Sequence, residues 1–311
     1  MEKLLPKGCY VILHIGLGPS RFVANDSPPL VVTESGPRFL LSDAIWIERL
    51  DQTLASNIQK ACEPPNFNIG NTAYDRHLYA FVRQVPDVEK SNHEGIEDLF
   101  GAIALSRLIH PTSIGDRYCA KVFHFGLQES AIQSVQYRGM SPDVFLSAGH
   151  RDWLSVAEAE QLRSLMPWLS RDKRMHHRVH RAYWSHEYAM RSYYLDMRWI
   201  LVVSGLEALI SVGEKDLARQ FRDRVGQLAA EFQIDLQDDD LRSAYKLRSK
   251  LVHAESFLHG LDAVLPQSEH GALYGTLESV LRNTLRRCLL EETFGDFFSD
   301  DAAIGKRWPL S

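Results

Sequence analysis

Apolar residues recur at steps of three or four along the second half of the chain, and this spacing constrains the fold more than any other feature. The step matches the 3.6-residue turn of an α-helix, so each segment carries one continuous apolar face. The clearest faces, in residues 215–232 and 270–294, comprise Leu217, Phe221, Val225, Leu228 and Phe232, and Leu273, Leu277, Leu281, Leu285 and Cys288. Several such faces are buried only against one another, so we expect a helical bundle over residues 151–311.

Two more segments continue this pattern between residues 150 and 215. Residues 153–166 predict a helix for which Ser155 is a candidate N-cap. A proline-free helical pattern runs from about 173 to 211, and the sequence leaves open whether it continues through Tyr194 or breaks there. The acidic and aromatic residues after 290 dock either on this bundle or on a partner, and the sequence favours neither.

The first half of the chain has a mixed pattern. Short apolar or alternating segments bounded by Gly, Pro, Ser or Asp predict strands at 9–18, 29–35, 37–42 and 119–126. Between them, residues 93–110 predict an amphipathic helix that ends before Pro111. We therefore expect an α+β N-terminal domain over residues 1–150, followed by the all-α helical bundle domain.

The charge and the cysteines exclude several classes of protein. A formal net charge of −5 gives no global basic field for nucleic acid, so a polyanion would have to meet a local basic patch. The four cysteines are far apart, which argues against a disulfide scaffold or a thiolate zinc site and fits a reducing cytoplasm. The N-terminus is a poor signal peptide, and the most apolar stretch, 199–212, is too short to span a bilayer. We expect a cytoplasmic protein with no membrane partner.

Residues 241–258 carry the chemistry that stands out in this chain. They predict one helix bearing Arg248 and His253 with four residues between them. Histidine titrates near neutral pH and moves protons, while the always-charged guanidinium of arginine holds phosphate. Ser249 lies one helical turn before His253, where its hydroxyl would hydrogen-bond the imidazole and fix its tautomer. This set of side chains is suited to cleaving a phosphodiester.

The spacing of the motif alone does not identify a site. The same Arg-x4-His pattern occurs at Arg171/His176 and at Arg181/His186, and 13 histidines in 311 residues produce such matches by chance. A solvated helix face that happens to carry an arginine, a serine and a histidine is the simpler interpretation of residues 241–258. Wider sequence context has to decide between the two.

That context comes from three ordered segments. Residues 177–211 end in the element Leu206-Glu207-Ala208-Leu209, residues 221–229 read FRDRVGQLA, and residues 244–256 read AYKLRSKLVHAES. In this order and spacing they resemble the Apea-like branch of the HEPN superfamily, across about residues 160–290. The last segment is similar to the family's pattern of a tyrosine, then Arg-Ser, then an apolar residue and a histidine. By this resemblance Arg248/His253 is the motif, and the matches at 171 and 181 are incidental.

The resemblance implies an all-helical domain that dimerises, with two Arg-x4-His motifs facing each other across the interface. Many members of the family are metal-independent ribonucleases of antiviral defence or toxin systems. Carried over to this sequence, the catalytic positions are His253 as general base or acid, Arg248 as phosphate clamp, Ser249 as the polar position after the arginine, and Glu207 as the acidic position that orients Arg248 or His253. The expected partners are RNA, a second copy of the chain and a regulatory or defence-system protein, with no cofactor and no metal. Residues 1–150 would sense a trigger or recruit substrate.

The expected reaction uses the nucleophile that RNA itself carries. A base takes the proton of the 2′-hydroxyl, an acid protonates the leaving 5′-oxygen, and a cation stabilises the phosphorane. One histidine cannot easily be both base and acid in one step, and a symmetric dimer brings two. The products would be a 2′,3′-cyclic phosphate and a 5′-hydroxyl end, and DNA would survive.

The sequence departs from the family pattern at one position. HEPN toxins paired with a minimal nucleotidyltransferase often carry a tyrosine two positions after the histidine, and Glu255 stands there in this chain. Neutralisation by nucleotide transfer onto a tyrosine is therefore not expected. The carboxylate also adds negative charge beside a proposed RNA site.

The densest basic run, residues 171–181, forms either a solvated face or a contact surface for RNA phosphates. The residues concerned are Arg171, Lys173, Arg174, Arg178 and Arg181. Within the run, His176 and His180 have the spacing of metal ligands on a helix, but no HExxH acid or nearby cysteine accompanies them. The aromatic residues after the run can stack on bases, although at helical spacing they more often fill a core, which we expect here. They are Tyr183, Trp184, Tyr193, Tyr194 and Trp199.

Two functions are thus weighed against each other, with a third in reserve. The first is a HEPN ribonuclease, and the second is a catalytically silent HEPN module that binds RNA or proteins as a scaffold in a defence complex. Only the enzyme must lose RNA cleavage when His253 is replaced by alanine. The third is a helical bundle that holds a metal through His176 and His180.

Overall fold

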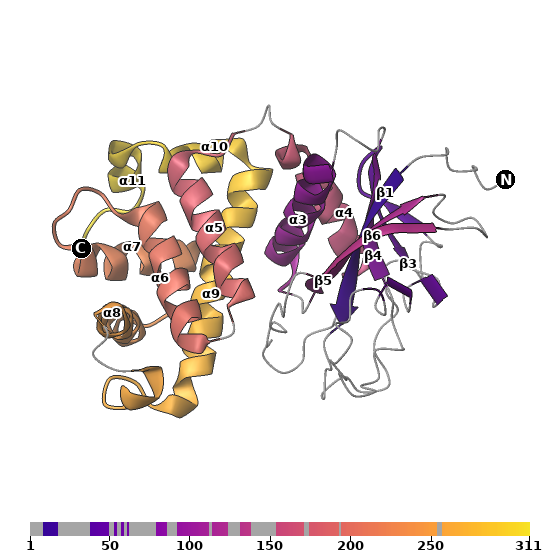
Figure 1. Ribbon diagram of the computed structural model, residues 1–311. Coiled ribbons are helices and arrows are strands. Elements are labelled where there is room, and N and C mark those ends of the chain that lie inside the picture. Colours follow the sequence, from indigo (N-terminus) through magenta and orange to yellow (C-terminus); the bar gives the residue numbers. More distant parts are fainter. Residues whose placement is uncertain are drawn as a thin grey trace. The chain divides into compact units, whose positions relative to one another are not determined.

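The computed structural model describes residues 9–17, 38–49, 53–54, 57–58, 61, 79–85, 92–111, 114–123, 131–137, 154–170, 174–192, 194–253 and 257–311. The chain divides into two compact units, Met1–Ser170 and Arg171–Ser311, each of which is drawn in Figure 1. The first unit is α+β and the second is helical, as the sequence predicts. The division follows α4 (Val156–Leu165) and lies later than the predicted boundary at 150, because α4 packs with α3 (Asn92–Ile109) of the first unit.

The described strands of the first unit form one antiparallel sheet in the order β2-β3-β4-β1-β5-β6. Their bounds are β1 Cys9–Leu17, β2 Arg38–Leu40, β3 Ile45–Arg49, β4 Tyr79–Val85, β5 Ile114–Phe123 and β6 Ala131–Tyr137. The first strand in the sequence is central, because Cys9 of β1 lies opposite both Val85 of β4 and Phe123 of β5. β4 and β5 both run antiparallel to β1 and therefore parallel to each other, and α3 is the connection between them.

Helix α3 supplies the apolar layer of this unit and contacts β4, β1 and β5. Its residues 102–109 are buried throughout, since they lie between the sheet and α4. α4 begins at the predicted cap: the Ser155 hydroxyl accepts from the backbone N–H of Glu158, and the Glu158 carboxylate accepts from that of Ser155 at 2.6 Å. The Arg163 side chain donates to the carbonyl of Leu40 at 2.7 Å, which fixes α4 against β2.

The predicted strands at 9–18, 37–42 and 119–126 correspond to β1, β2 and β5, and the predicted helix at 93–110 corresponds to α3. The predicted strand at 29–35 lies outside the described residues. Three strands were not predicted, namely β3, β4 and β6. β3 is only five residues long, and β6, at the edge of the sheet, is interrupted by glutamines and a serine, so neither has the apolar run on which the predictions rest.

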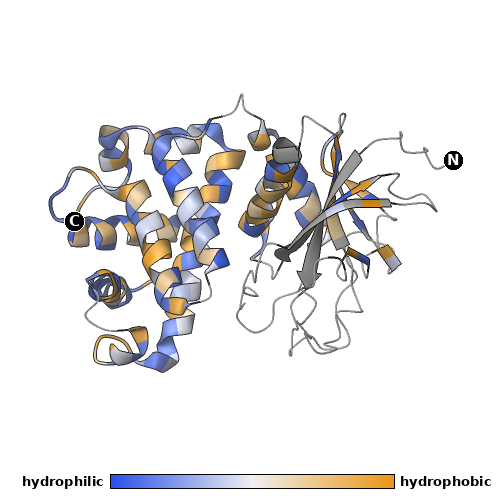
Figure 2. Cartoon of the chain, in the orientation of Figure 1, coloured by the Kyte–Doolittle hydropathy of each residue, from blue (hydrophilic) through white to orange (hydrophobic). Residues whose placement is uncertain are grey.

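The second unit is built from helices whose apolar and polar faces are visible as alternating orange and blue in Figure 2. They are α5 His177–Arg191, α6 Leu195–Ile210, α7 Leu217–Glu231, α8 Asp238–Val252, α9 Gln267–Leu290, α10 Glu292–Gly295 and α11 Asp301–Arg307. α6 contacts α5, α7, α8 and α9 and is the most enclosed of them. Its Trp199 is fully buried and donates from Nε1 to the carbonyl of Ala244 in α8 at 3.2 Å.

The long helical pattern from 173 to 211 breaks between α5 and α6, near Tyr194. Ser192 and Tyr194 have extended backbones, with ψ of 136° and 130°. The Arg198 side chain donates to the carbonyl of Ser192 at 2.7 Å, which satisfies one of the carbonyls that the end of α5 leaves open. The sequence left open whether the helix continues through Tyr194 or breaks there, and the structure shows that it breaks.

The prediction of one helix over residues 241–258 is wrong at both ends. α8 begins at Asp238, where Gln237 and Asp240 form a capping box, and it ends at Val252. His253 is the residue after the helix, and a 3₁₀ turn follows at Leu258–Gly260. The chain cannot continue the helix to 258, because the backbone N–H of Leu258 is bonded to the carboxylate of Asp196 in α6 at 3.2 Å.

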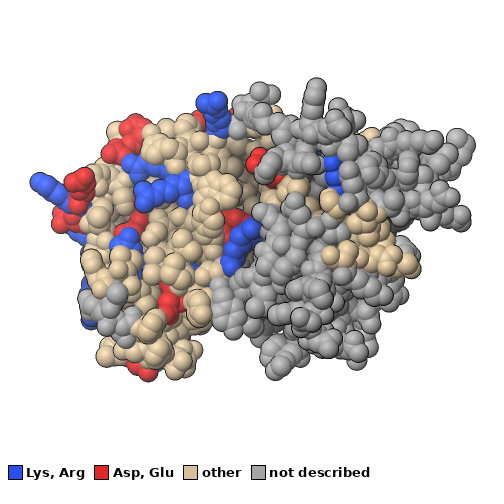
Figure 3. Space-filling model, in the orientation of Figure 1, with Lys and Arg blue, Asp and Glu red and all other residues tan. Residues whose placement is uncertain are grey.

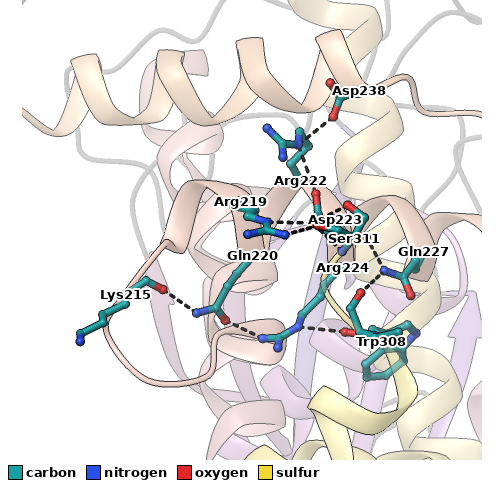
Figure 4. A network of polar contacts seen from close by, with 11 residues as sticks. Lys215, Arg219, Gln220, Arg222, Asp223, Arg224, Gln227, Asp238, Trp308 and Ser311 are labelled. Atoms are coloured by element: carbon teal, nitrogen blue, oxygen red, sulfur yellow. Dashed lines mark hydrogen bonds and ion pairs between the residues drawn. The ribbon is translucent and has the colours of Figure 1, made fainter.

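The C-terminal residues dock on α7, as Figure 4 shows. Ser311 donates from its backbone N–H and its hydroxyl to Asp223 at 3.0 and 2.8 Å. Arg224 donates to the carbonyl of Trp308 at 3.0 Å, and the buried Trp308 ring stacks on Phe298. The acidic and aromatic tail thus belongs to the bundle, which the sequence left undecided.

No helix among the described residues is long and apolar enough to cross a membrane.

Candidate functional site

Arg248 of α8 and Glu207 of α6 form an ion pair, with 2.7 Å between Nη2 and Oε2. The crossing of α6 and α8 brings the two side chains together, although they are 41 positions apart in the sequence (248 − 207). Tyr245, one turn before Arg248, hydrogen-bonds the same carboxylate through its hydroxyl. The guanidinium carbon of Arg248 lies 6.0 Å from the centre of the Tyr245 ring. The site therefore has a cation fixed from two sides.

Burial dominates the electrostatics of this pair. It raises the pKa of Glu207, while the charge of Arg248, the hydrogen bond from Tyr245 and the charge of Arg181 oppose that rise. Burial and the neighbouring Glu207 carboxylate likewise raise the pKa of the Tyr245 hydroxyl. The charge of Arg181 in α5 is the smallest of these effects, and the contacts of the site come from α6 and α8.

The guanidinium of Arg248 is partly open to solvent. Its side chain is 26% exposed, while that of Glu207 is 12% exposed. The Nε atom of Arg248 is buried and has no hydrogen-bond partner in the described part of the chain. A guanidinium has five N–H donors, and the carboxylate occupies only part of them. Arg248 is therefore partly exposed and has N–H donors beyond those that Glu207 occupies, as binding of an anion requires.

His253 is exposed and lies one residue beyond the end of α8. Its backbone N–H donates to the carbonyl of Ser249 at 3.0 Å. The contact predicted between these two residues is not the one found, because no described contact joins the Ser249 hydroxyl to the imidazole. That backbone bond keeps the helical i, i−4 spacing, so the two side chains share a face of the helix without a hydrogen bond between them among the described residues. Glu255 lies outside the described residues.

The residues of the basic run have different surroundings. Arg171 and Lys173 lie outside the described residues, and Arg174 and Arg181 are exposed. Arg178 does not fit an RNA-binding role, since its guanidinium donates to the carbonyls of Ala208 and Ser211 and pairs with Asp301. Only Arg174 and Arg181 of the five predicted positions are seen to be accessible. Figure 3 shows cationic and anionic side chains interspersed on one face of the second unit.

Of the two other Arg-x4-His matches, Arg181/His186 is unsuited to catalysis, and Arg171/His176 is only partly described. His186 is fully buried and bonds Glu278 of α9 at 2.8 Å, so no substrate reaches it. His176 is exposed and pairs with Asp296, while its partner Arg171 is not described. In the described part of the chain no group of three or more His, Cys, Asp or Glu side chains is placed to hold a metal ion. His180, the other suggested metal ligand, accepts a hydrogen bond from the Trp184 indole.

The aromatic residues after the basic run divide into two sets. Tyr183 and Trp199 are buried, as expected for core residues. The expectation is wrong for Trp184 and Tyr194, which are 42% and 68% exposed, and Tyr193 lies outside the described residues. Trp184 points away from the bundle because its neighbour Tyr183 occupies the buried side of α5.

Two features were not predicted from the sequence: the contact of Tyr245 with Glu207, and the exposure of Tyr188 on α5. The first had a signal, since Tyr245 stands three positions before Arg248 and therefore shares its helix face. The exposure of Tyr188 has no signal in the sequence, because an aromatic residue at helical spacing gives the same pattern whether it faces the core or solvent.

Comparison of the chain with protein-family models, with curated proteins and with solved structures finds no match.

Proposed function

We propose that this chain is a metal-independent endoribonuclease of the HEPN type that acts in prokaryotic antiviral defence or in a toxin system. One observation carries the proposal. α8 presents a guanidinium that Glu207 orients and leaves partly open, and an exposed imidazole lies just past the end of the same helix. The choice of family is supported by the three ordered sequence segments, which resemble HEPN proteins, and a helical second unit fits that choice.

The proposed reaction is transfer of phosphorus from the 5′-oxygen to the 2′-oxygen of RNA. His253 takes the proton of the 2′-hydroxyl, the 2′-oxygen forms a bond to phosphorus, and the bond to the 5′-oxygen breaks. A second imidazole gives a proton to the leaving 5′-oxygen. Arg248 stabilises the charge of the phosphorane, since a fixed guanidinium needs little reorganisation as that charge develops. The products are a 2′,3′-cyclic phosphate and a 5′-hydroxyl.

A second copy of the chain supplies the second imidazole in this proposal. Exposed apolar side chains flank the motif, with Val252 at 47% and Phe257 at 68% exposure. Apolar surface of this kind around His253 fits an interface that buries both motifs. The role proposed for the first unit is to sense a trigger or recruit the substrate.

The deciding experiment is cleavage of total cellular RNA by the full chain in EDTA, beside Arg248→Ala and His253→Ala. Two matched variants serve as controls: Arg242→Ala removes an exposed arginine from the same helix, and His259→Ala removes an exposed histidine after it. We expect fragments with cyclic-phosphate ends from the wild type and both controls. We expect a loss of at least about 100-fold from each motif variant.

A silent HEPN module is the second candidate, and one observation favours it. The charge of Arg248 is already balanced by Glu207, as in a purely structural ion pair. Such a module would bind RNA or proteins within a defence complex without cleaving RNA. Equal cleavage by all variants would exclude the proposed site. No cleavage by any of them, with RNA bound, would favour the silent module.

A further inference from the structure

The outer face of α5 carries aromatic and basic side chains where a surface helix usually carries mixed charge. His177, Arg181, Trp184 and Tyr188 follow one another at steps of four, three and four, so they form one stripe along the helix. All four are exposed, and we call them the α5 stripe. The buried residues of the helix lie on the opposite side and include Val179, Ala182, Tyr183, His186, Ala189 and Met190.

The two aromatic rings of the stripe are held in place. The Trp184 indole N–H donates to Nε2 of His180 at 2.9 Å, and the buried Tyr183 contacts the indole edge-on, with 5.8 Å between the ring centres. The rings of Trp184 and Tyr188 are 5.7 Å apart and tilted by 31°. Both are about half exposed, at 42% and 56%. Rings that are already fixed lose little conformational freedom when they bind a flat partner.

The stripe itself carries a cation and no exposed acid. The one acidic residue of α5, Glu187, is buried and pairs with Arg191 at 2.6 Å. The exposed cations are Arg181 on the stripe and Arg174 before the helix. A contact of the stripe with its own copy would place like charges together, with no exposed acid on α5 to balance them. A polyanion with flat apolar groups is the complementary partner.

We propose that the α5 stripe binds single-stranded RNA, with bases stacked on Trp184 and Tyr188 and phosphates at Arg181 and Arg174. The inference rests on the proposed ribonuclease for its choice of nucleic acid. The stripe and the candidate site belong to neighbouring helices, since α5 packs against α6, which carries Glu207. Paired bases do not present their faces, so the stripe selects unpaired segments.

The test measures binding separately from cleavage. The full chain carries His253→Ala so that RNA survives, and its Kd for a fluorescein-labelled oligouridylate of about 12 nucleotides is measured by fluorescence anisotropy. We expect Trp184→Ala and Tyr188→Ala each to weaken binding about tenfold. Trp184→Phe retains a ring without the N–H and stays within about threefold of the parent. Leu290→Ala, which removes an equally exposed side chain from α9, is the control and leaves the Kd unchanged.

Two results would overturn the inference. One is an unchanged Kd in both alanine variants. The other is weaker binding that accompanies a change in sedimentation from dimer to monomer, which would assign the stripe to a second copy of the chain. Stacking-dependent binding by a chain whose wild type cleaves no RNA would refute the ribonuclease and support the stripe. Normal RNA cleavage by the wild type, with a Kd that Trp184→Ala leaves unchanged, would support the ribonuclease and refute the stripe.

Discussion

The carboxylate of Glu207 holds the guanidinium of Arg248 at 2.7 Å, and burial raises the pKa of that carboxyl. The ion pair is lost when Glu207 takes a proton, and burial raises the pKa at which this happens above the ordinary glutamate value. In the proposed ribonuclease, Glu207 acts through Arg248, whose guanidinium it positions.

Glu207→Gln should lower the rate of RNA cleavage about tenfold at neutral pH, because an amide orients Arg248 less firmly than a carboxylate. As pH drops, protonation of the His253 base should lower the rate in the wild type and the variant alike, and protonation of Glu207, whose pKa is raised, should add a further fall in the wild type alone. The measurement is the pH–rate profile, with the exposed Glu269→Gln as control. A variant that keeps this further fall would remove Glu207 from the site.

Glu231→Gln should lower the free energy of unfolding by about 2 kcal/mol at pH 7. The carboxylate accepts from Arg307 at 2.8 Å, from Trp308 at 2.8 Å and from Arg287 at 3.0 Å. Burial opposes its ionisation, but these donors prevail and lower its pKa. Its contribution is thus present above the unfolded pKa of about 4.3 and disappears as pH falls through the lower folded value. Urea unfolding at several pH values should show the wild type and the variant converging in acid.

His186→Ala should cost about 3 kcal/mol of stability or more, because it leaves the buried Glu278 with only Arg282 as a charged partner. Burial raises the pKa of Glu278, but Arg282 and His186 outweigh it and the net shift is downward. The matched control is His176→Ala, which removes an exposed histidine from a pair with Asp296 and should cost less than about 0.5 kcal/mol. Equal losses in urea unfolding would mean that the His186–Glu278 pair adds nothing.

Gly205→Ala should destabilise the bundle by about 1 to 3 kcal/mol, since its Cβ would lie 2.8 Å from Leu281 and 3.2 Å from Ser185. Helices α5 and α9 approach α6 at this residue. Gly275→Ala in α9 meets no atom within 4 Å and should stabilise the chain by up to about 1 kcal/mol through helix propensity. Thermal unfolding of the two variants should shift in opposite directions. A shift of the same sign in both would refute the close approach.

The sequence predicts the helical half of the chain well, because apolar spacing reports directly on which face of a helix is buried. Phe221, Val225 and Leu228 are predicted on one face and all are buried in α7. The non-helical position of Leu258 could not be predicted, since its backbone N–H bonds Asp196 of α6, 62 positions away in the sequence. β6 escaped prediction because an edge strand needs few apolar residues.

The residues of the candidate site could be predicted from the sequence, but the contacts between their side chains could not. Arg248 and Glu207 could be named from sequence, but their contact depends on how α6 crosses α8. The accessibility of Trp184 and the engagement of Arg178 depend on which neighbours the fold provides, and no pattern in α5 encodes either.

The central place of β1 has a consequence for synthesis of the chain. Cys9–Leu17 is synthesised before its partners Tyr79–Val85 and Ile114–Phe123, which emerge much later. One edge of this strand therefore lacks its partner until Val85 of β4 is made, and the other until Phe123 of β5 is made. Such long-range pairing makes the first unit slow to form, and the nascent chain must avoid aggregation until then.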